Sequence, residues 1–398
     1  MNIQQYIEKN KNNHKSFLEH LDTKNSDDFQ ILYEYIKDLK IHGNHNELGI
    51  VLRFILNISN NHHRHADFFK KIDQILLQFK DDIKQYYTNF DLFRHFKSNK
   101  RILLFLIKEQ ILTIDEFVAE KLLSEKYRKF GYHIYFFPEI KEYMDSYTKL
   151  QTEYQFKKYN QNGINLFDLQ RRVGQNDSNI TSYIREDSLT QFLSYVKDRK
   201  ITFSTPIEYS IFETNQFLLD KKPTVLEYAA FFGSYEIFNH LVVQKKAKLQ
   251  PSIWLYAIHG NNSKIIKMLV DRKILPEDET YFKCIKEGIK CHHNELINYI
   301  QTKIMKTQSI EDYKVKTKSI KYVNFEYLPN DLTNGYFFYK LCQFDYVTLV
   351  GILLKFKNIN TGFVVIQNFH FFNKISIEFI FIKFQNYFHK YNFYLFLF

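Results

Sequence analysis

The sequence is poor in the residues that make turns and cross-links. Its 398 residues include 11 glycines, 6 prolines and 3 cysteines, and no proline precedes Pro138. β-Sandwiches and β-barrels need many turns, so these low numbers argue against both classes. The cysteines, Cys284, Cys291 and Cys342, form no C-x-x-C pair, and no disulfide framework is predicted.

Long apolar segments are also missing. The first residues, MNIQQYIEKNKNNHK, contain no apolar signal-peptide core. No uncharged apolar run reaches the about 18 residues that a membrane-spanning helix needs. We therefore expect no membrane span and a reducing intracellular compartment, chiefly the cytoplasm, with the nucleus left open.

Familiar catalytic motifs are absent. The chain has no G-x-x-x-x-G-K-[ST] or G-x-G-x-x-G loop to hold a phosphate, no H-E-x-x-H and no G-x-S-x-G. The sequence therefore predicts no catalytic residue, no cofactor and no enzyme of a familiar class.

Two groups of histidines and cysteines raise the question of a metal site. His62, His63 and His65 lie in a polar loop, and Cys291 is followed by His292 and His293, with Cys284 seven residues earlier. Neither group has the two-pair spacing of a structural zinc site. No metal site is predicted.

The net charge is +11, with a pI near 9.1, which favours nucleic acid and anionic membrane surfaces. The lysines are nevertheless scattered. The densest cluster, formed by Lys314, Lys316, Lys318 and Lys321, is interrupted by polar and apolar residues. A solvated lysine-rich surface is the main interpretation, and nucleic acid is not the expected partner. A basic surface that binds a polyanion, either nucleic acid or an anionic membrane, is the alternative function.

The chain is rich in apolar residues that recur at helical spacing. In the first part Val51, Phe54, Ile55 and Ile58 are one example of several such segments separated by polar breaks. We expect an α-helical N-terminal region over 1–155. Residues 156–182 are polar and low in large aliphatic residues, and they are predicted to be a junction.

The second half is repetitive. The segment 224–243, TVLEYAAFFGSYEIFNHLVV, predicts two helices, and Thr224 and Glu227 form a T-x-x-E capping box at the start of the first. The packed positions of the first copy are Leu226, Ala229, Ala230, Ile237, Phe238 and Leu241. The matching residues of the next copies are Trp254, Ala257, Ile258, Ile265, Ile266 and Leu269; Ile285, Gly288, Ile289, Leu296, Ile297 and Ile300; and Phe338, Leu341, Cys342, Leu349, Val350 and Leu353.

One position of this frame is the turn after the first helix. It requires a left-handed backbone, which glycine accepts freely and which asparagine, aspartate and histidine adopt more often than other residues. The four copies place Gly233, Asn261, His292 and Asp345 there. The frame therefore agrees with the backbone geometry that it needs.

The predicted fold is all-α: a helical solenoid with ankyrin-like repeats over 183–358, after the α-helical N-terminal region. Successive copies are 28 and 31 residues apart, whereas the usual ankyrin period is about 33. The β-turn fingers that connect ankyrin repeats are therefore expected to be short or absent. The gap at 301–330 is expected to carry its own helix. Residues 359–398 form an atypical aromatic-rich tail, for which a terminal cap, a membrane or partner anchor, and a translated non-coding end are the three interpretations.

The segments GQNDSNITSYIREDSLTQFLSYV, SIFETNQFLLDKKPTVLEYAAFFGSYEIFNHL, PSIWLYAIHGNN and CHHNELINYI carry a resemblance. Over 174–300 the chain resembles the large protozoan family of ankyrin-repeat proteins that carry an associated domain of unknown function. NNHHRHADFFKKI and HFKSNKRILLFLI resemble the same family more loosely. The resemblance implies a scaffold or interaction role and supplies no agreed activity or ligand.

A non-catalytic scaffold that binds a protein partner through a concave helical face is the predicted function. First-helix positions between the core residues would line that face: Phe231, Phe232, His259, Lys290, Gln343 and Phe344. Exposed aromatic residues suit a protein partner. In the competing interpretation Phe231 and Phe232 pack on the preceding segment. Trp254 stands at a core position and is expected to be buried, and the protein is expected to be a monomer.

Overall fold

The computed structural model describes residues 1–23, 28–38, 41–62, 65, 67–307, 310 and 312–355. The regular structure of these residues is helical, and their strand-like pairing is limited to an isolated bridge between Pro206 and Thr224. The predicted all-α class is confirmed. The aromatic-rich tail, 359–398, lies outside the described residues.

The described residues of the first half are mainly helical. Its elements are α1 (Ile3–Asp22), α2 (Asp28–Asp38), α3 (His45–Asn61), α4 (Phe68–Gln78), α5 (Lys80–Tyr86), α6 (Asn89–Phe96), α7 (Lys100–Lys108), α8 (Glu116–Leu123), α9 (Glu125–Arg128), α10 (Tyr132–Tyr135), α11 (Phe137–Ile140), η1 (Lys141–Tyr143), α12 (Ser146–Tyr159) and α13 (Ile164–Val173). The predicted junction, 156–182, therefore holds the end of α12, the whole of α13 and the start of the next helix.

The second half consists of short helices in pairs. Its elements are α14 (Asn179–Arg185), α15 (Leu189–Arg199), α16 (Gln216–Lys221), α17 (Val225–Phe232), α18 (Tyr235–Asn239), the π-helical turn η2 (His240–Gln244), α19 (Ile253–Gly260), α20 (Ser263–Asp271), α21 (Phe282–Cys291), α22 (Asn294–Tyr299), the π-helical turn η3 (Ile300–Ile304), α23 (Tyr313–Lys321), η4 (Phe325–Tyr327), α24 (Gly335–Gln343) and α25 (Val347–Leu353). The helix expected in the gap at 301–330 is α23.

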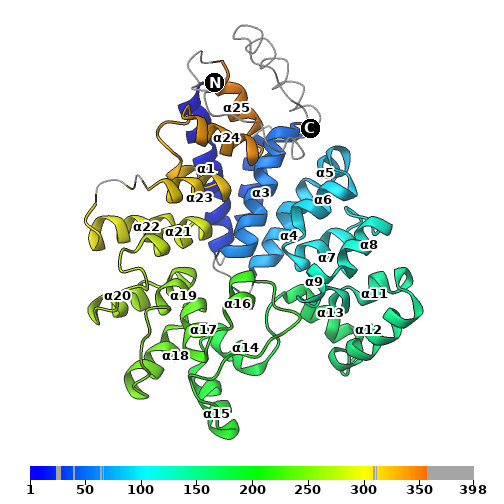
Figure 1. Ribbon diagram of the computed structural model, residues 1–398, viewed down its shortest axis with the longest axis vertical. Helices are drawn as coiled ribbons and strands as arrows, with labels where there is room; N and C mark the ends of the chain where they lie inside the picture. The colour runs from blue at the N-terminus through cyan, green and yellow to red at the C-terminus, as the bar shows by residue number, and fades with distance from the viewer. Residues whose placement is uncertain are drawn as a thin grey trace.

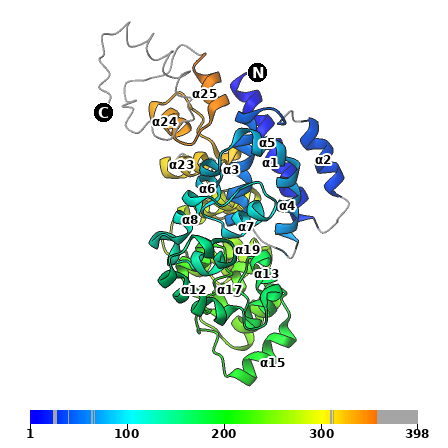
Figure 2. The ribbon, with the colours of Figure 1, turned by 90° about the vertical axis from the view of Figure 1, so that its right-hand side faces the viewer.

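The chain doubles back on itself. Helices α3 to α13 run down one side of the molecule, α14 and α15 lie at the bottom, and α17 to α25 return up the other side (Figure 1). The last helices thereby reach the first ones: α25 packs against both α1 and α3, as the turned view also shows (Figure 2). Tyr6 of α1 and Ile50 of α3 are buried in one core with Phe325, Leu349 and other residues of the last helices.

The repeat frame read from the sequence matches the packing. All of its residues are buried except Cys342, which is half-buried. First helices of successive pairs pack on one another, in the order α14, α17, α19, α21, α23 and α24. Trp254 has no exposed surface, and its indole Nε1 donates a hydrogen bond to the Ile274 carbonyl at 2.7 Å. The capping box of Thr224 and Glu227 is also present.

The turn positions have the predicted backbone. Gly233, Asn261, His292 and Asp345 have φ of 67°, 48°, 59° and 51°, all left-handed. Two further helix pairs share the feature but were not assigned from the sequence. Asp187, with φ of 50°, follows α14, and Val323, with φ of 57°, follows α23. The six left-handed residues define what we call the turn edge of the repeat stack.

Side chains just after the turn edge link each repeat to the one before it. Carbonyls in the last turn of a helix lack the amide four residues further on, so they can accept from a neighbour. His293 Nδ1, Asn324 Nδ2 and the Tyr346 hydroxyl donate to the carbonyls of Ile258, Ile289 and Ile320, at 2.8, 3.1 and 2.8 Å. Each of these carbonyls lies three residues before a turn-edge residue. This regular bonding holds the stack in register.

The turn frame predicts the effect of two substitutions. Gly233→Val is expected to destabilise the protein by about 1–3 kcal/mol, because a β-branched residue would be held in a left-handed conformation. Its Cβ would also lie 2.8 Å from the Gly260 carbonyl oxygen. Asn261→Gly should be neutral or slightly stabilising, since glycine adopts this conformation without strain. Thermal melts of both variants test the frame, and a Gly233→Val protein that melts like the parent would contradict it.

Candidate functional site

The N-terminal helices lie along the turn edge of the repeats. The imidazole of His292 meets the rings of Phe54 and His14, with ring centres 5.0 and 5.9 Å away. Further along, Arg53 of α3 donates to the carbonyl of Asp345 at 3.0 Å. Residues almost 300 positions apart in the sequence are thus joined at the turn edge.

The end of α3 forms a group of hydrogen bonds with the repeats. Asn215 Nδ2 donates to the Asn60 carbonyl at 2.9 Å, and His62 Nδ1 donates to the Cys291 carbonyl at 2.6 Å. His62 Nε2 lies 3.0 Å from the Asp22 carboxylate of α1. The next carbonyl of α3, that of Asn61, lies 3.2 Å from His259 Nδ1. We call this region, residues 60–62 with their partners, the seam.

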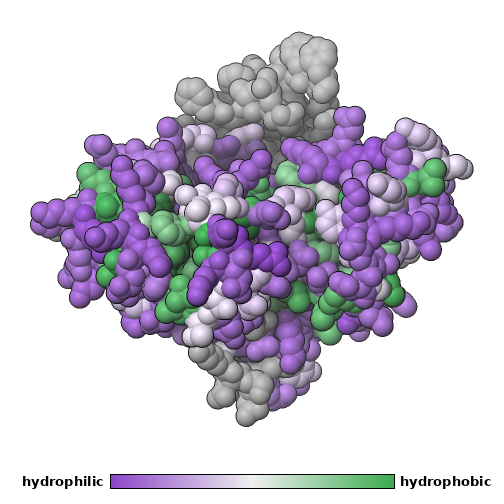
Figure 3. All heavy atoms as spheres, turned by 90° about the horizontal axis from the view of Figure 1, so that it is seen from below, coloured by the Kyte–Doolittle hydropathy of each residue, from purple (hydrophilic) through white to green (hydrophobic). Residues whose placement is uncertain are grey.

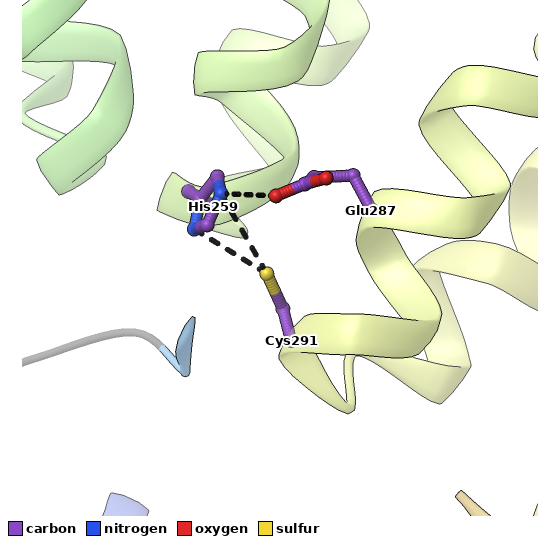
Figure 4. A group of neighbouring side chains, drawn as sticks. All are labelled: His259, Glu287 and Cys291. Atoms are coloured by element: carbon purple, nitrogen blue, oxygen red, sulfur yellow. Dashed lines mark hydrogen bonds and ion pairs between the residues drawn. The ribbon is translucent and has the colours of Figure 1, made fainter. Parts of the chain in front are cut away.

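A cluster of three titratable side chains lies at the seam (Figure 4). His259 comes from α19, and Glu287 and Cys291 come from one face of α21, one turn apart. His259 Nε2 is 2.8 Å from Glu287 Oε1, and Cys291 Sγ is 3.3 Å from His259 Nδ1 and 4.0 Å from Nε2. Lys290 Nζ donates to the same Glu287 oxygen at 2.8 Å.

Burial and neighbouring charges together set the protonation of this cluster. Burial raises the pKa of the Cys291 thiol well above its usual range. Burial would also raise the pKa of Glu287, but hydrogen bonds and charge from His259 and Lys290 outweigh it and lower that pKa to about 2. The arrangement has the order of a cysteine nucleophile, a histidine base and an orienting carboxylate. A thiol that stays protonated and buried is not an activated nucleophile.

The structure corrects the predicted partner-binding face. His259 was expected on the exposed side of its helix, but only 1% of it is exposed. Phe231 and Phe232 are also buried, at 5% and 6%. The Phe217 ring of α16 covers Phe231 and His259, with ring centres 5.9 and 4.4 Å away, and the Asn61 carbonyl approaches His259 from α3. The competing interpretation, in which these phenylalanines pack on the preceding segment, agrees with the packing of Phe231 on α16.

The other sequence candidates are scattered. Lys290 is half-buried and paired with Glu287, Gln343 is exposed and Phe344 is half-buried. In the histidine-rich loop His62 reaches the seam, and His63 lies outside the described residues. Glu287 was not identified from the sequence. The spacing of Glu287 and Cys291 on one helix face was visible there, but the proximity of His259 depends on how the repeats stack.

A groove of about 990 Å³ opens beside the seam, between α1 on one side and α22 with η4 on the other. Five carboxylates line it, those of Glu8, Glu19, Asp22, Glu295 and Glu326, against two lysines, Lys11 and Lys15. Both lysines already pair with groove carboxylates. In a protein of net charge +11, this groove is locally acidic.

The densest lysine cluster of the sequence does not form one surface. Lys316 is buried, with its Nζ 3.5 Å from the Leu328 carbonyl, whereas Lys314 is exposed. Lys318 and Lys321 lie over the ring of Tyr322. Seen from below, hydrophilic side chains cover most of the molecule and the hydrophobic ones form several separate patches (Figure 3).

Comparisons with known proteins identify no relative: no family model, no curated protein and no solved structure matches the chain. Among the described residues, no helix has the length and apolar character to cross a membrane.

Stability should fall as the solution is acidified below the ordinary histidine pKa. Burial lowers the pKa of His95 to about 4 and that of His14 well below its usual value. The charged and titratable groups around them are Arg53, Arg94, Asp91 and His45 for His95, and His292 for His14. Below a pH of about 6.5 the unfolded chain gains protons that the folded chain refuses, so acid favours unfolding.

Denaturant unfolding at about pH 7.5 and about pH 5 checks this expectation, since few carboxylates titrate in that interval. The free energy of unfolding should be lower at the acidic pH. His95→Phe should reduce the difference, because it removes one of the buried bases. Equal free energies at the two pH values would contradict the burial of neutral histidines.

Proposed function

We propose that the chain is a non-catalytic scaffold of ankyrin-like repeats that binds a protein partner. The observation that carries the proposal is the docking of α1 and α3 on the turn edge, through contacts such as Arg53 with Asp345 and His62 with Cys291. A repeat stack that recognises helices of its own chain in this way has a surface suited to protein segments. The protonated, buried Cys291 thiol supports a role without catalysis.

At Phe231 and His259 the concave face first considered is covered by α16 and the end of α3, so we look for the partner's site elsewhere. The groove between α1 and α22 is the best candidate. Its volume of about 990 Å³ is of the size that takes several side chains of a peptide. Its excess of carboxylates favours a polypeptide segment that carries lysine or arginine, because complementary charge steers and selects a partner.

A displayed library of random peptides, selected on the full-length chain, tests the function. Peptides rich in lysine and arginine should be enriched, and their binding should survive moderate salt because side-chain packing accompanies the charge. A labelled single-stranded oligonucleotide provides the comparison for polyanion binding, whose affinity falls steeply with salt. Enrichment of acidic peptides, or tight oligonucleotide binding at moderate salt, would overturn the proposal.

Glu295→Lys should weaken binding of a selected peptide by about tenfold or more, since it places a like charge in the groove. Glu236→Lys is the matched control. Both glutamates are exposed and stand three residues after a turn-edge residue, at the start of a second helix, but only Glu295 lines the groove. Isothermal titration of the two variants measures the difference, and equal losses in both would show that the groove is not the site.

A further inference from the structure

The cluster of His259, Glu287 and Cys291 offers three ligand atoms of different chemistry. These are an imidazole nitrogen, a carboxylate oxygen and a thiol sulfur, and they all lie within 4.8 Å of one another. Glu287 and Cys291 stand four residues apart, so both project from the same face of α21, while His259 reaches them from α19. Nitrogen, sulfur and oxygen ligands together are typical of zinc.

The contacts of His259 show how one of its ring nitrogens could bind a cation. The Asn61 carbonyl, which can only accept, lies 3.2 Å from Nδ1, and a ring with its hydrogen on Nδ1 donates to that carbonyl. In a neutral ring Nε2 then has a lone pair, and this lone pair faces Glu287 Oε1 at 2.8 Å. Two acceptors at that distance repel each other unless a positive charge lies between them. Either a hydrogen on Nε2 or a metal ion meets this requirement.

The surroundings resemble those of metal ligands in other proteins. A metal-binding histidine usually donates its other ring hydrogen to a carbonyl or carboxylate, and the Asn61 carbonyl stands 3.2 Å from His259 Nδ1 to accept it. A ligating carboxylate is itself hydrogen-bonded, as Glu287 is by Lys290. Tetrahedral zinc holds nitrogen, oxygen and sulfur ligands about 3.3–3.6 Å apart, given its bond lengths. The separations of 2.8 Å to oxygen and 4.0 Å to sulfur from Nε2 bracket that range.

We propose that His259 Nε2, a carboxylate oxygen of Glu287 and the sulfur of Cys291 bind Zn²⁺, with a water molecule as the fourth ligand. Binding releases the thiol proton to the solvent, because the sulfur coordinates as a thiolate. The carboxylate side of the cluster gives access, since 18% of the Glu287 side chain is exposed. The ion would join α19 to α21 and fix the ring that contacts α3, so it would strengthen the seam.

Metal titration of the full-length chain, first treated with a chelator, tests the site. Zn²⁺ should raise the melting temperature. Co²⁺ should give the near-ultraviolet absorption of a thiolate-to-cobalt charge transfer, together with the intense visible bands of a tetrahedral ion. Zn²⁺ should abolish both signals by competition. A cobalt spectrum without the thiolate band would overturn the proposal, and it would leave a proton as the charge between His259 and Glu287.

Variants separate this site from adventitious binding. Cys291→Ser should remove the thiolate band and weaken Zn²⁺ binding by more than about 100-fold, since loss of even an outer-shell partner costs 10–100-fold. Cys284→Ser is the matched control, because Cys284 is a buried thiol on the same helix but outside the cluster. Glu287→Gln should weaken binding while keeping the carboxamide near Lys290. If Cys291→Ser fails to fold, the thiolate-to-cobalt band of the parent protein still shows whether a cysteine binds the ion. Binding that is unchanged in both Cys291→Ser and Glu287→Gln would show an adventitious ion only.

Discussion

Gly260→Ala should destabilise the protein by about 3 kcal/mol, because it adds a methyl group where two helices touch through their backbones. An added Cβ would lie closer to the Ala230 carbonyl oxygen than real Cβ atoms come to any neighbour, and 2.9 Å from the Gly233 amide nitrogen. Neither backbone atom can move without shifting α17 against α19. Among the glycines of the repeat stack, Gly260 is the one where an added Cβ would come closest to a neighbouring first helix.

Gly351→Ala is the matched control for this variant. Gly351 is also helical, within α25, and an added Cβ there meets no atom within 4 Å. Alanine should therefore be neutral or stabilise by about 0.5–1 kcal/mol, as expected for glycine replaced inside a helix. Urea unfolding of both variants measures the difference. A Gly260→Ala protein as stable as Gly351→Ala would mean that α17 and α19 do not approach so closely.

Arg171→Met should cost about 3–5 kcal/mol, because it removes a buried guanidinium and leaves the half-buried Glu139 carboxylate and the Tyr135 carbonyl without their donor. Only 1% of Arg171 is exposed. Its guanidinium donates to both Glu139 oxygens, at 2.7 and 3.0 Å, to the Tyr135 carbonyl at 2.9 Å, and to Asp168. It therefore ties α13 to α10 and α11.

Arg172→Met provides the comparison, since Arg172 is the exposed neighbour on the same helix. Exposed substitutions of this kind change stability by no more than about 0.5 kcal/mol. Chemical denaturation of the two variants at one pH separates loss of the buried network from loss of a positive charge. Equal effects in both would contradict the placement of Arg171 in the core.

The repeat frame could be predicted because its signal is local. Helical spacing, the capping box of Thr224 and Glu227 and the left-handed turn residues are each properties of a short segment, and the structure has them. The pair that begins with α23 has Val323 at its turn. A β-branched residue is a poor candidate for a left-handed turn, so this position gives no local signal for the frame.

The docking of the N-terminal helices could not be predicted in the same way. The contacts of His62 with Cys291 and of Arg53 with Asp345 join residues that no periodicity relates. They decide whether a first-helix residue is exposed, as His259 shows: its position on the helix was right, but another part of the chain covers it. The cluster with Glu287 and Cys291 has the same origin, since it needs the stacking of α19 on α21.

Hydrogen exchange of the full-length chain, with and without a basic peptide selected from the library, tests the central claim most directly. The account predicts slower exchange on peptide binding in α1 and α22, which form the two walls of the groove, and unchanged exchange in α12. The core amides of α1 should already be protected without peptide, because Phe17 and Leu21 are fully buried. Fast exchange throughout α1 in the free protein, or peptide protection that falls on α12 and spares the groove, would contradict it.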